Sequence, residues 1–88
     1  MDCKRIYESV CFIVKDTVGT TNVVINDKTN IIEDGLISSL KLVEMIIKLE
    51  EHFSIEFDAF MMNAQNFATI TNIFEIVSNE LLKKEAGE

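Results

Sequence analysis

The sequence predicts an all-α protein, a small four-helix bundle of three main helices and one short helix, folded as one domain over residues 1–88. In three stretches the apolar residues recur at steps of three and four, which is the spacing of one face of an α-helix. Apolar residues make up 48% of the 88 residues, enough to build one modest core. The chain has no proline, so no predicted helix is broken by one.

The first helix is predicted from Asp2 to about Val18. Its apolar positions are Cys3, Ile6, Tyr7, Val10, Cys11, Ile13, Val14 and Val18. Asp2 suits the positive end of the helix dipole, and Gly19 is a natural stop. We expect Tyr7 at the edge of the core, with its hydroxyl in contact with water.

The connection from Gly19 to Ile37 supports two interpretations. Residues 20–25 are rich in β-branched side chains, and a possible turn at Asn26-Asp27 precedes residues 29–32, as in a β-hairpin. The alternative is a loop of a length that is uncommon in compact domains. Such a loop would be held on the core by the apolar residues Val23, Ile25, Ile31, Ile32, Leu36 and Ile37.

The second helix has the strongest pattern and is predicted from Leu40 to Phe53, about four turns. Its predicted apolar face consists of Leu40, Val43, Ile46, Ile47 and Leu49, widened by Leu42, Met45 and Phe53. Its polar positions are Lys41, Glu44, Lys48 and Glu51. Glu44 lies four residues before Lys48, the favourable order for an ion pair worth about 0.2–0.5 kcal/mol.

The C-terminal third is predicted to hold a short helical turn and a long helix. Residues 54–57 alternate polar and apolar like an extended link, and Asn63 can cap a single turn over residues 64–67. The last helix is predicted from Thr69 or Thr71 to about Lys84, with residues 85–88 as a frayed tail. Its predicted buried face is Ile70, Ile73, Phe74, Ile76, Val77, Leu81 and Leu82.

Charge and cysteine content argue against several classes of ligand and site. The net charge of −7 argues against nucleic acid and anionic membranes as ligands, and favours partners with basic patches. Cys3 and Cys11 lie about 12 Å apart along one helix, too far for a disulfide, and we expect two free thiols in or near the core. With no signal peptide and no apolar run that could span a bilayer, we expect a cytoplasmic monomer.

No constellation of catalytic residues is evident. The sequence lacks a plausible Ser-His-acid set, a glycine-rich phosphate loop and clustered metal ligands, and its single histidine, His52, lies at the polar end of a helix. We therefore expect no enzyme, with a reaction at Cys3 or Cys11 as the weakest alternative.

Two serines stand at the start of the second helix. Ser38 is a good N-cap, and Ser39 would then be the first helical residue. Unpaired amides and the helix dipole make this position suitable for a phosphate. On spacing alone, helix capping is the favoured explanation of both serines.

Several segments resemble the acyl carrier protein family. They are Gly35-Leu36-Ile37-Ser38-Ser39-Leu40, then Leu42-Val43-Glu44, then Leu49-Glu50-Glu51-His52-Phe53-Ser54-Ile55-Glu56. Asp58-Ala-Phe60, Asn66-Phe67 and Thr69-Ile70 look like the third-helix region of stand-alone and aminoacyl carriers. The resemblance covers most of the chain, and it favours the long loop over the hairpin.

The resemblance implies a covalent cofactor, 4′-phosphopantetheine, which a phosphopantetheinyl transferase transfers from coenzyme A. Ser39 matches the attachment serine of the family, Ser38 and Leu40 flank it, and the arm would carry acyl or aminoacyl groups as thioesters. The expected partners are enzymes of fatty acid, polyketide or related biosynthesis. Four residues of the second helix are candidates for contact with them: Lys41, Glu44, Lys48 and Glu51. Met61 and Met62 are expected to fill the core or contact a bound acyl chain.

One position departs from the family pattern. Ser38 stands where the family usually has an aspartate, which keeps the cap but removes a carboxylate that the transferase is expected to recognise. Lys41 and Lys48 also interrupt a face that is often more uniformly acidic. The alternatives to an acyl carrier are an aminoacyl, D-alanyl or peptidyl carrier, and a helical interaction module of the same fold that is never modified.

Overall fold

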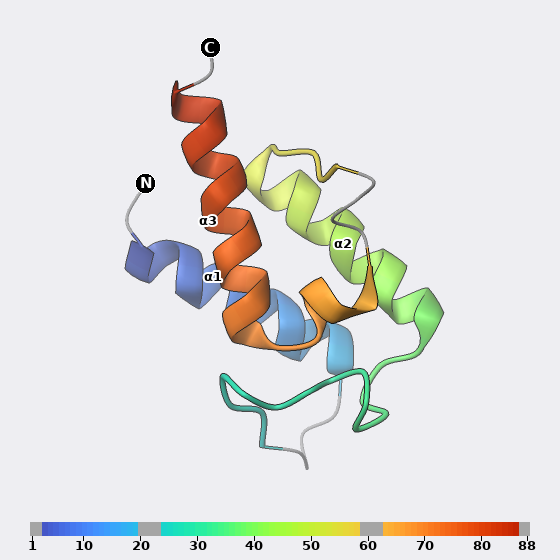
Figure 1. Ribbon diagram of the computed structural model, residues 1–88. Coiled ribbons are helices and arrows are strands. Elements are labelled where there is room, and N and C mark those ends of the chain that lie inside the picture. Colours follow the sequence, from blue (N-terminus) through green and yellow to red (C-terminus); the bar gives the residue numbers. More distant parts are fainter. Residues whose placement is uncertain (1–2, 20–23, 59–62, 87–88) are drawn as a thin grey trace.

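The computed structural model describes residues 3–19, 24–58 and 63–86. All the regular secondary structure in this part of the chain is helical. It contains α1 (Cys3–Val18), α2 (Ser39–Phe53), the 3-10 turn η2 (Ala64–Phe67) and α3 (Ile70–Ala86) (Figure 1). No strand occurs in these residues, which confirms the all-α prediction for them. None of the helices in these ranges is long and apolar enough to cross a membrane.

The boundaries of α1 follow the sequence pattern closely. Its inner face buries Ile6, Val10, Ile13, Val14 and Thr17. Gly19 adopts a positive φ of 71°, and its amide donates to the Lys15 carbonyl at 3.0 Å. The predicted glycine stop is confirmed, because the left-handed conformation that ends this helix is one that glycine adopts without steric cost.

Tyr7 links α1 to the first loop and to α3. Its hydroxyl donates a hydrogen bond to the Asp27 carboxylate, and its ring packs edge-on against Phe74 with 5.9 Å between ring centroids. The Asp27 carbonyl in turn accepts from the Thr71 amide at 3.3 Å. Tyr7 is half-buried at the edge of the core, and the loop brings the exposed Asp27 carboxylate to its hydroxyl.

The first loop lies against the core, as expected for the long-loop interpretation. Ile31 is fully buried, and its amide donates to the Ala68 carbonyl at 2.8 Å, which joins the loop to the end of η2. Ile37 is buried as well, and three further predicted contacts are partly buried against the core, namely Ile25, Ile32 and Leu36. Residues 24–37 contain no strand, whereas Val23 and the rest of residues 20–23 lie outside the described residues.

The core lies where α1 packs against α2 and α3. In Figure 1, α3 crosses α1, and η2 leads into the first turn of α3. Phe67 of η2 is fully buried and stacks edge-on with Phe57 of the link, with 5.3 Å between ring centroids. The predicted turn at residues 64–67 is confirmed, and Asn63 caps it by accepting from the Asn66 amide at 3.0 Å.

The C-terminal end of α2 is fixed by contacts with the segments that follow it. Ser54 ends the helix with a positive φ of 55°. The Glu50 carboxylate accepts from the Phe57 amide at 2.9 Å, and the Lys84 ammonium donates to the Ser54 carbonyl at 2.7 Å. A cation at this position also complements the negative end of the α2 dipole.

Three details differ from the sequence predictions, and one prediction lies outside the described residues. Cys3 is the first residue of α1 and is exposed. Cys11 is half-buried, and both thiols are free. Leu82 is exposed, on the opposite side of α3 from Val77 and its buried neighbours. Helix α3 begins at Ile70 and extends two residues beyond the expected end, to Ala86. Met61 and Met62 lie outside the described residues.

Candidate functional site

The start of α2 is built by Ser38. Its backbone is extended, with φ −88° and ψ 174°, and its hydroxyl accepts from the Lys41 amide at 3.2 Å. Its carbonyl accepts from the Leu42 amide at 2.9 Å, the first hydrogen bond of the helical ladder. The predicted N-cap is confirmed, and a serine performs it about as well as an aspartate would.

Ser39 is the first residue of α2 and is exposed to solvent. It therefore presents a primary hydroxyl at the positive end of the helix dipole, ahead of the first intrahelical hydrogen bond. A phosphodiester on this oxygen would extend into solvent and would be stabilised by that dipole. The residues present thus fit a phosphate-linked group at Ser39.

The outer face of α2 exposes large apolar side chains next to Ser39. Leu40 is 70% exposed, Val43 53% and Ile47 46%. The prediction that these three side chains belong to the buried face was wrong. Apolar positions cover more than half of the circumference of this helix, and the core takes the part where Met45, Ile46, Leu49 and Phe53 are buried.

Acidic residues lie among these exposed apolar side chains. At about 100° per residue, Glu44 and Glu51 share the arc of Leu40 and Ile47. Both glutamates are exposed. The centre of the outer face of α2 is therefore apolar and acidic at once, a composition suited to contact with a partner that is apolar and basic.

Lysines and the histidine follow one edge of the same face. By helical position, Lys41, Lys48 and His52 lie within one narrow arc. The Lys48 ammonium pairs with Asp16 of α1 at 3.1 Å, in place of the ion pair with Glu44 that the sequence suggested. Lys48 therefore reaches α1, and its charge is balanced within the fold.

Lys41 has a different environment. It is exposed in the first turn of α2, a turn that contains no acidic residue. In residues 3–19, 24–58 and 63–86, no carboxylate forms an ion pair with its ammonium. A cation at a helix N-terminus opposes the dipole at a cost of about 0.3–1 kcal/mol, so Lys41 does not stabilise this helix.

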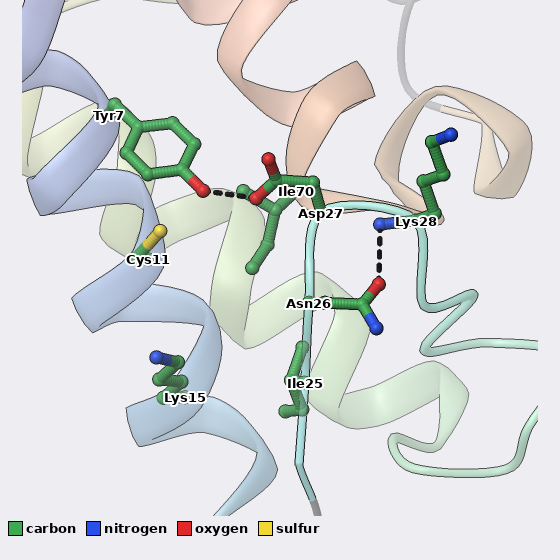
Figure 2. Close-up of a pocket in the computed structure, with 8 residues that line it drawn as sticks. All are labelled: Tyr7, Cys11, Lys15, Ile25, Asn26, Asp27, Lys28 and Ile70. Carbon is green, nitrogen blue, oxygen red and sulfur yellow. Dashed lines mark hydrogen bonds between the residues drawn. The ribbon is translucent and has the colours of Figure 1, made fainter.

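A separate pocket lies between α1, the first loop and the start of α3. It has a volume of about 500 Å³ and is lined by Tyr7, Cys11, Lys15, Ile25, Asn26, Asp27, Lys28 and Ile70. Figure 2 shows the Tyr7–Asp27 hydrogen bond across one wall, and the Lys28 amide donating to Asn26. None of these residues belongs to α2, so the pocket is separate from Ser39. Within the described ranges, no three His, Cys, Asp or Glu side chains gather to hold a metal ion.

The structure brings all the predicted site residues to one helix. Ser38, Ser39 and Leu40 form its N-terminal end, and Lys41, Glu44, Lys48 and Glu51 lie along its outer surface. The predicted set omitted Val43 and Ile47, because their apolar character assigned them to the core. Their positions in the arc of Glu44 and Glu51 were the available signal.

Comparison with known proteins finds a distant similarity over most of the chain. The chain is similar to an acyl carrier protein. That relative comes from Coprothermobacter proteolyticus and is 26% identical over 84 residues, an alignment that covers 96% of this chain and all of the relative. No protein-family model matches the chain.

Proposed function

We propose that this chain is a stand-alone carrier protein that bears 4′-phosphopantetheine on Ser39 and presents acyl or aminoacyl groups to partner enzymes. The observation that carries the proposal is the exposed hydroxyl of Ser39 at the capped N-terminus of α2, beside an exposed apolar and acidic helix face. The similarity to an acyl carrier protein over 84 residues supports it.

When bound, the cofactor would supply a terminal thiol that holds the cargo as a thioester on a flexible arm. The chain's own part is to hold, orient and recognise. Ser38 fixes the helix start, so that the Ser39 oxygen has a defined position. At the other end of α2, contacts of Glu50 and Lys84 join the helix to the link and to α3.

The proposed partners are a phosphopantetheinyl transferase, with coenzyme A as donor, and the enzymes that load and consume the cargo in fatty acid, polyketide or related biosynthesis. An acidic chain of net charge −7 encounters partners with basic patches faster than neutral ones. Two free thiols in α1 suit a reducing compartment, so we propose that the chain acts in the cytoplasm. D-alanyl and other aminoacyl cargoes fit the same attachment chemistry.

A second candidate is a helical interaction module that is never modified. The observation that favours it is the first turn of α2, which has no acid where a transferase is expected to find a carboxylate. The exposed apolar side chains of Leu40, Val43 and Ile47 would then serve protein binding alone.

One experiment separates the two candidates. The purified chain is incubated with a broad-specificity phosphopantetheinyl transferase, magnesium and coenzyme A, and its intact mass is recorded over time. The carrier proposal expects a single phosphopantetheine mass gain, mapped by peptide fragmentation to Ser39, and a new thiol that accepts an acyl group. A mass that stays constant with several transferases of different origin would favour the unmodified module.

A further inference from the structure

The electrostatics of Lys41 conflict with the helix to which it belongs. Lys41 is exposed in the first turn of α2, without an acidic neighbour in that turn. The helix dipole disfavours a cation there. Residues that break a local rule without a compensating contact are expected at functional sites. The stability of the helix therefore gives no reason for a lysine at this position.

Lys41 is also the lysine of α2 that remains available near the attachment serine. Lys48, two turns further along the same edge, is paired with Asp16 at 3.1 Å. Lys41 is two residues from Ser39 and borders the exposed side chain of Leu40, which is 70% exposed. The positive charge that is not balanced within the fold therefore lies at the end of α2 that carries Ser39. A partner's opening would receive the arm at this end.

We propose that Lys41 determines partner specificity by pairing with a carboxylate on the partner enzyme, beside the opening that receives the arm. This inference rests on the proposed carrier function. Glu44 and Glu51 would face basic side chains of the same partner, and the exposed apolar residues would pack between the two zones. A partner patch that is basic throughout would meet like charge at Lys41, which is unfavourable.

The test uses a broad-specificity phosphopantetheinyl transferase whose docking patch is basic, together with a panel of its single Lys or Arg to Glu variants. The substrates are the parent chain, Lys41→Glu, Lys41→Gln and the matched control Lys28→Glu. Lys28 is exposed and lines the pocket between α1, the loop and α3, so its reversal makes the same change in net charge away from α2. Circular dichroism verifies the fold of each variant, and intact mass against time gives kcat/KM.

We expect Lys41→Glu to raise kcat/KM with the unaltered transferase about tenfold, Lys41→Gln about threefold and Lys28→Glu less than about twofold. At least one charge-reversed transferase should then prefer the parent chain over Lys41→Glu. That reciprocal change is the signature of a direct ion pair, which a purely structural role of Lys41 would not produce.

Three outcomes overturn the inference. Equal effects of Lys41→Glu and Lys28→Glu would mean that only net charge matters. A transferase panel without any reversal of preference would exclude a carboxylate partner for Lys41. A Lys41→Glu chain that is slower with every transferase would instead assign Lys41 to the phosphates of coenzyme A. If no chain gains mass at all, the carrier proposal itself fails, and that result is distinct from modification at equal rates.

Discussion

The Ser38 hydroxyl accepts a hydrogen bond from the Lys41 amide at 3.2 Å, so an uncharged residue caps the helix that carries the candidate attachment serine. Ser38→Ala should lose about 1 kcal/mol of unfolding free energy, because the Lys41 amide loses its acceptor. Ser38→Asp should be as stable as the parent or more stable by about 0.3–1 kcal/mol, since it adds negative charge at the helix N-terminus. Urea denaturation of the three chains measures both effects.

The same Ser38→Asp variant should be modified faster than the parent by a generic transferase. Such an enzyme must bring coenzyme A and its metal ion to Ser39, and a carboxylate beside that oxygen is a suitable ligand or ion-pair partner. Intact mass against time provides the rate. An equal or lower rate with the fold intact would show that serine at this position belongs to the recognition of a dedicated partner.

Charge reversal on the outer face of α2 should slow docking. Glu44→Lys and Glu51→Lys each replace an exposed carboxylate, so each should lower kcat/KM with a basic partner by about tenfold and leave stability within about 0.5 kcal/mol. Added salt should slow the parent chain and flatten these differences, because it screens exposed charges. If kcat/KM stays unchanged in both variants and at all salt concentrations, the exposed charges of α2 do not determine the rate of docking.

Two phenylalanines provide a matched test of the fold. Phe67 is fully buried against Phe57, whereas Phe12 on the outer side of α1 is 71% exposed. Phe67→Ala should cost about 3–5 kcal/mol through lost burial and a residual cavity, which is enough to unfold a small domain. Phe12→Ala should change the free energy of unfolding by no more than about 0.5 kcal/mol. Similar losses from both substitutions in thermal or urea denaturation would contradict the packing described for η2.

The Tyr7–Asp27 hydrogen bond should make stability depend on alkaline pH. The bond raises the pKa of Tyr7 above its ordinary value of 10.0, with a smaller contribution from Cys11. The folded chain thus keeps the phenol proton at pH values where the unfolded chain releases it. The stabilisation is complete below the ordinary value and is lost as pH rises toward the folded one. The stability advantage of the parent over Tyr7→Phe in urea denaturation should therefore be constant at lower pH and shrink once the pH rises above about 10, and a difference that stays constant there would disprove the linkage.

The helices could be predicted from the sequence because their signals are local. The steps of three and four in α1, the Gly19 stop and the Ser38 cap each depend on residues within one turn of the chain, and the structure agrees with all three. The cap at Asn63 is of the same kind.

The faces and contacts of those helices depended on information that is not local. Helix α2 is apolar on both sides, so periodicity could not decide between the side of Leu40 and the side of Met45, and the packing of α1 and α3 decided it. The Lys48–Asp16 ion pair and the Tyr7–Asp27 hydrogen bond join residues 32 and 20 positions apart. Neither spacing follows from helical periodicity.

The central claim is that Ser39, and not its neighbour, receives the cofactor. The most direct measurement is the intact mass of Ser39→Ala and of Ser38→Ala after incubation with transferase and coenzyme A, with circular dichroism to show that both chains are folded. We predict that Ser39→Ala gains no phosphopantetheine mass, while Ser38→Ala, which weakens only the cap, is still modified. A mass gain on folded Ser39→Ala, or its loss in folded Ser38→Ala alone, would contradict the account.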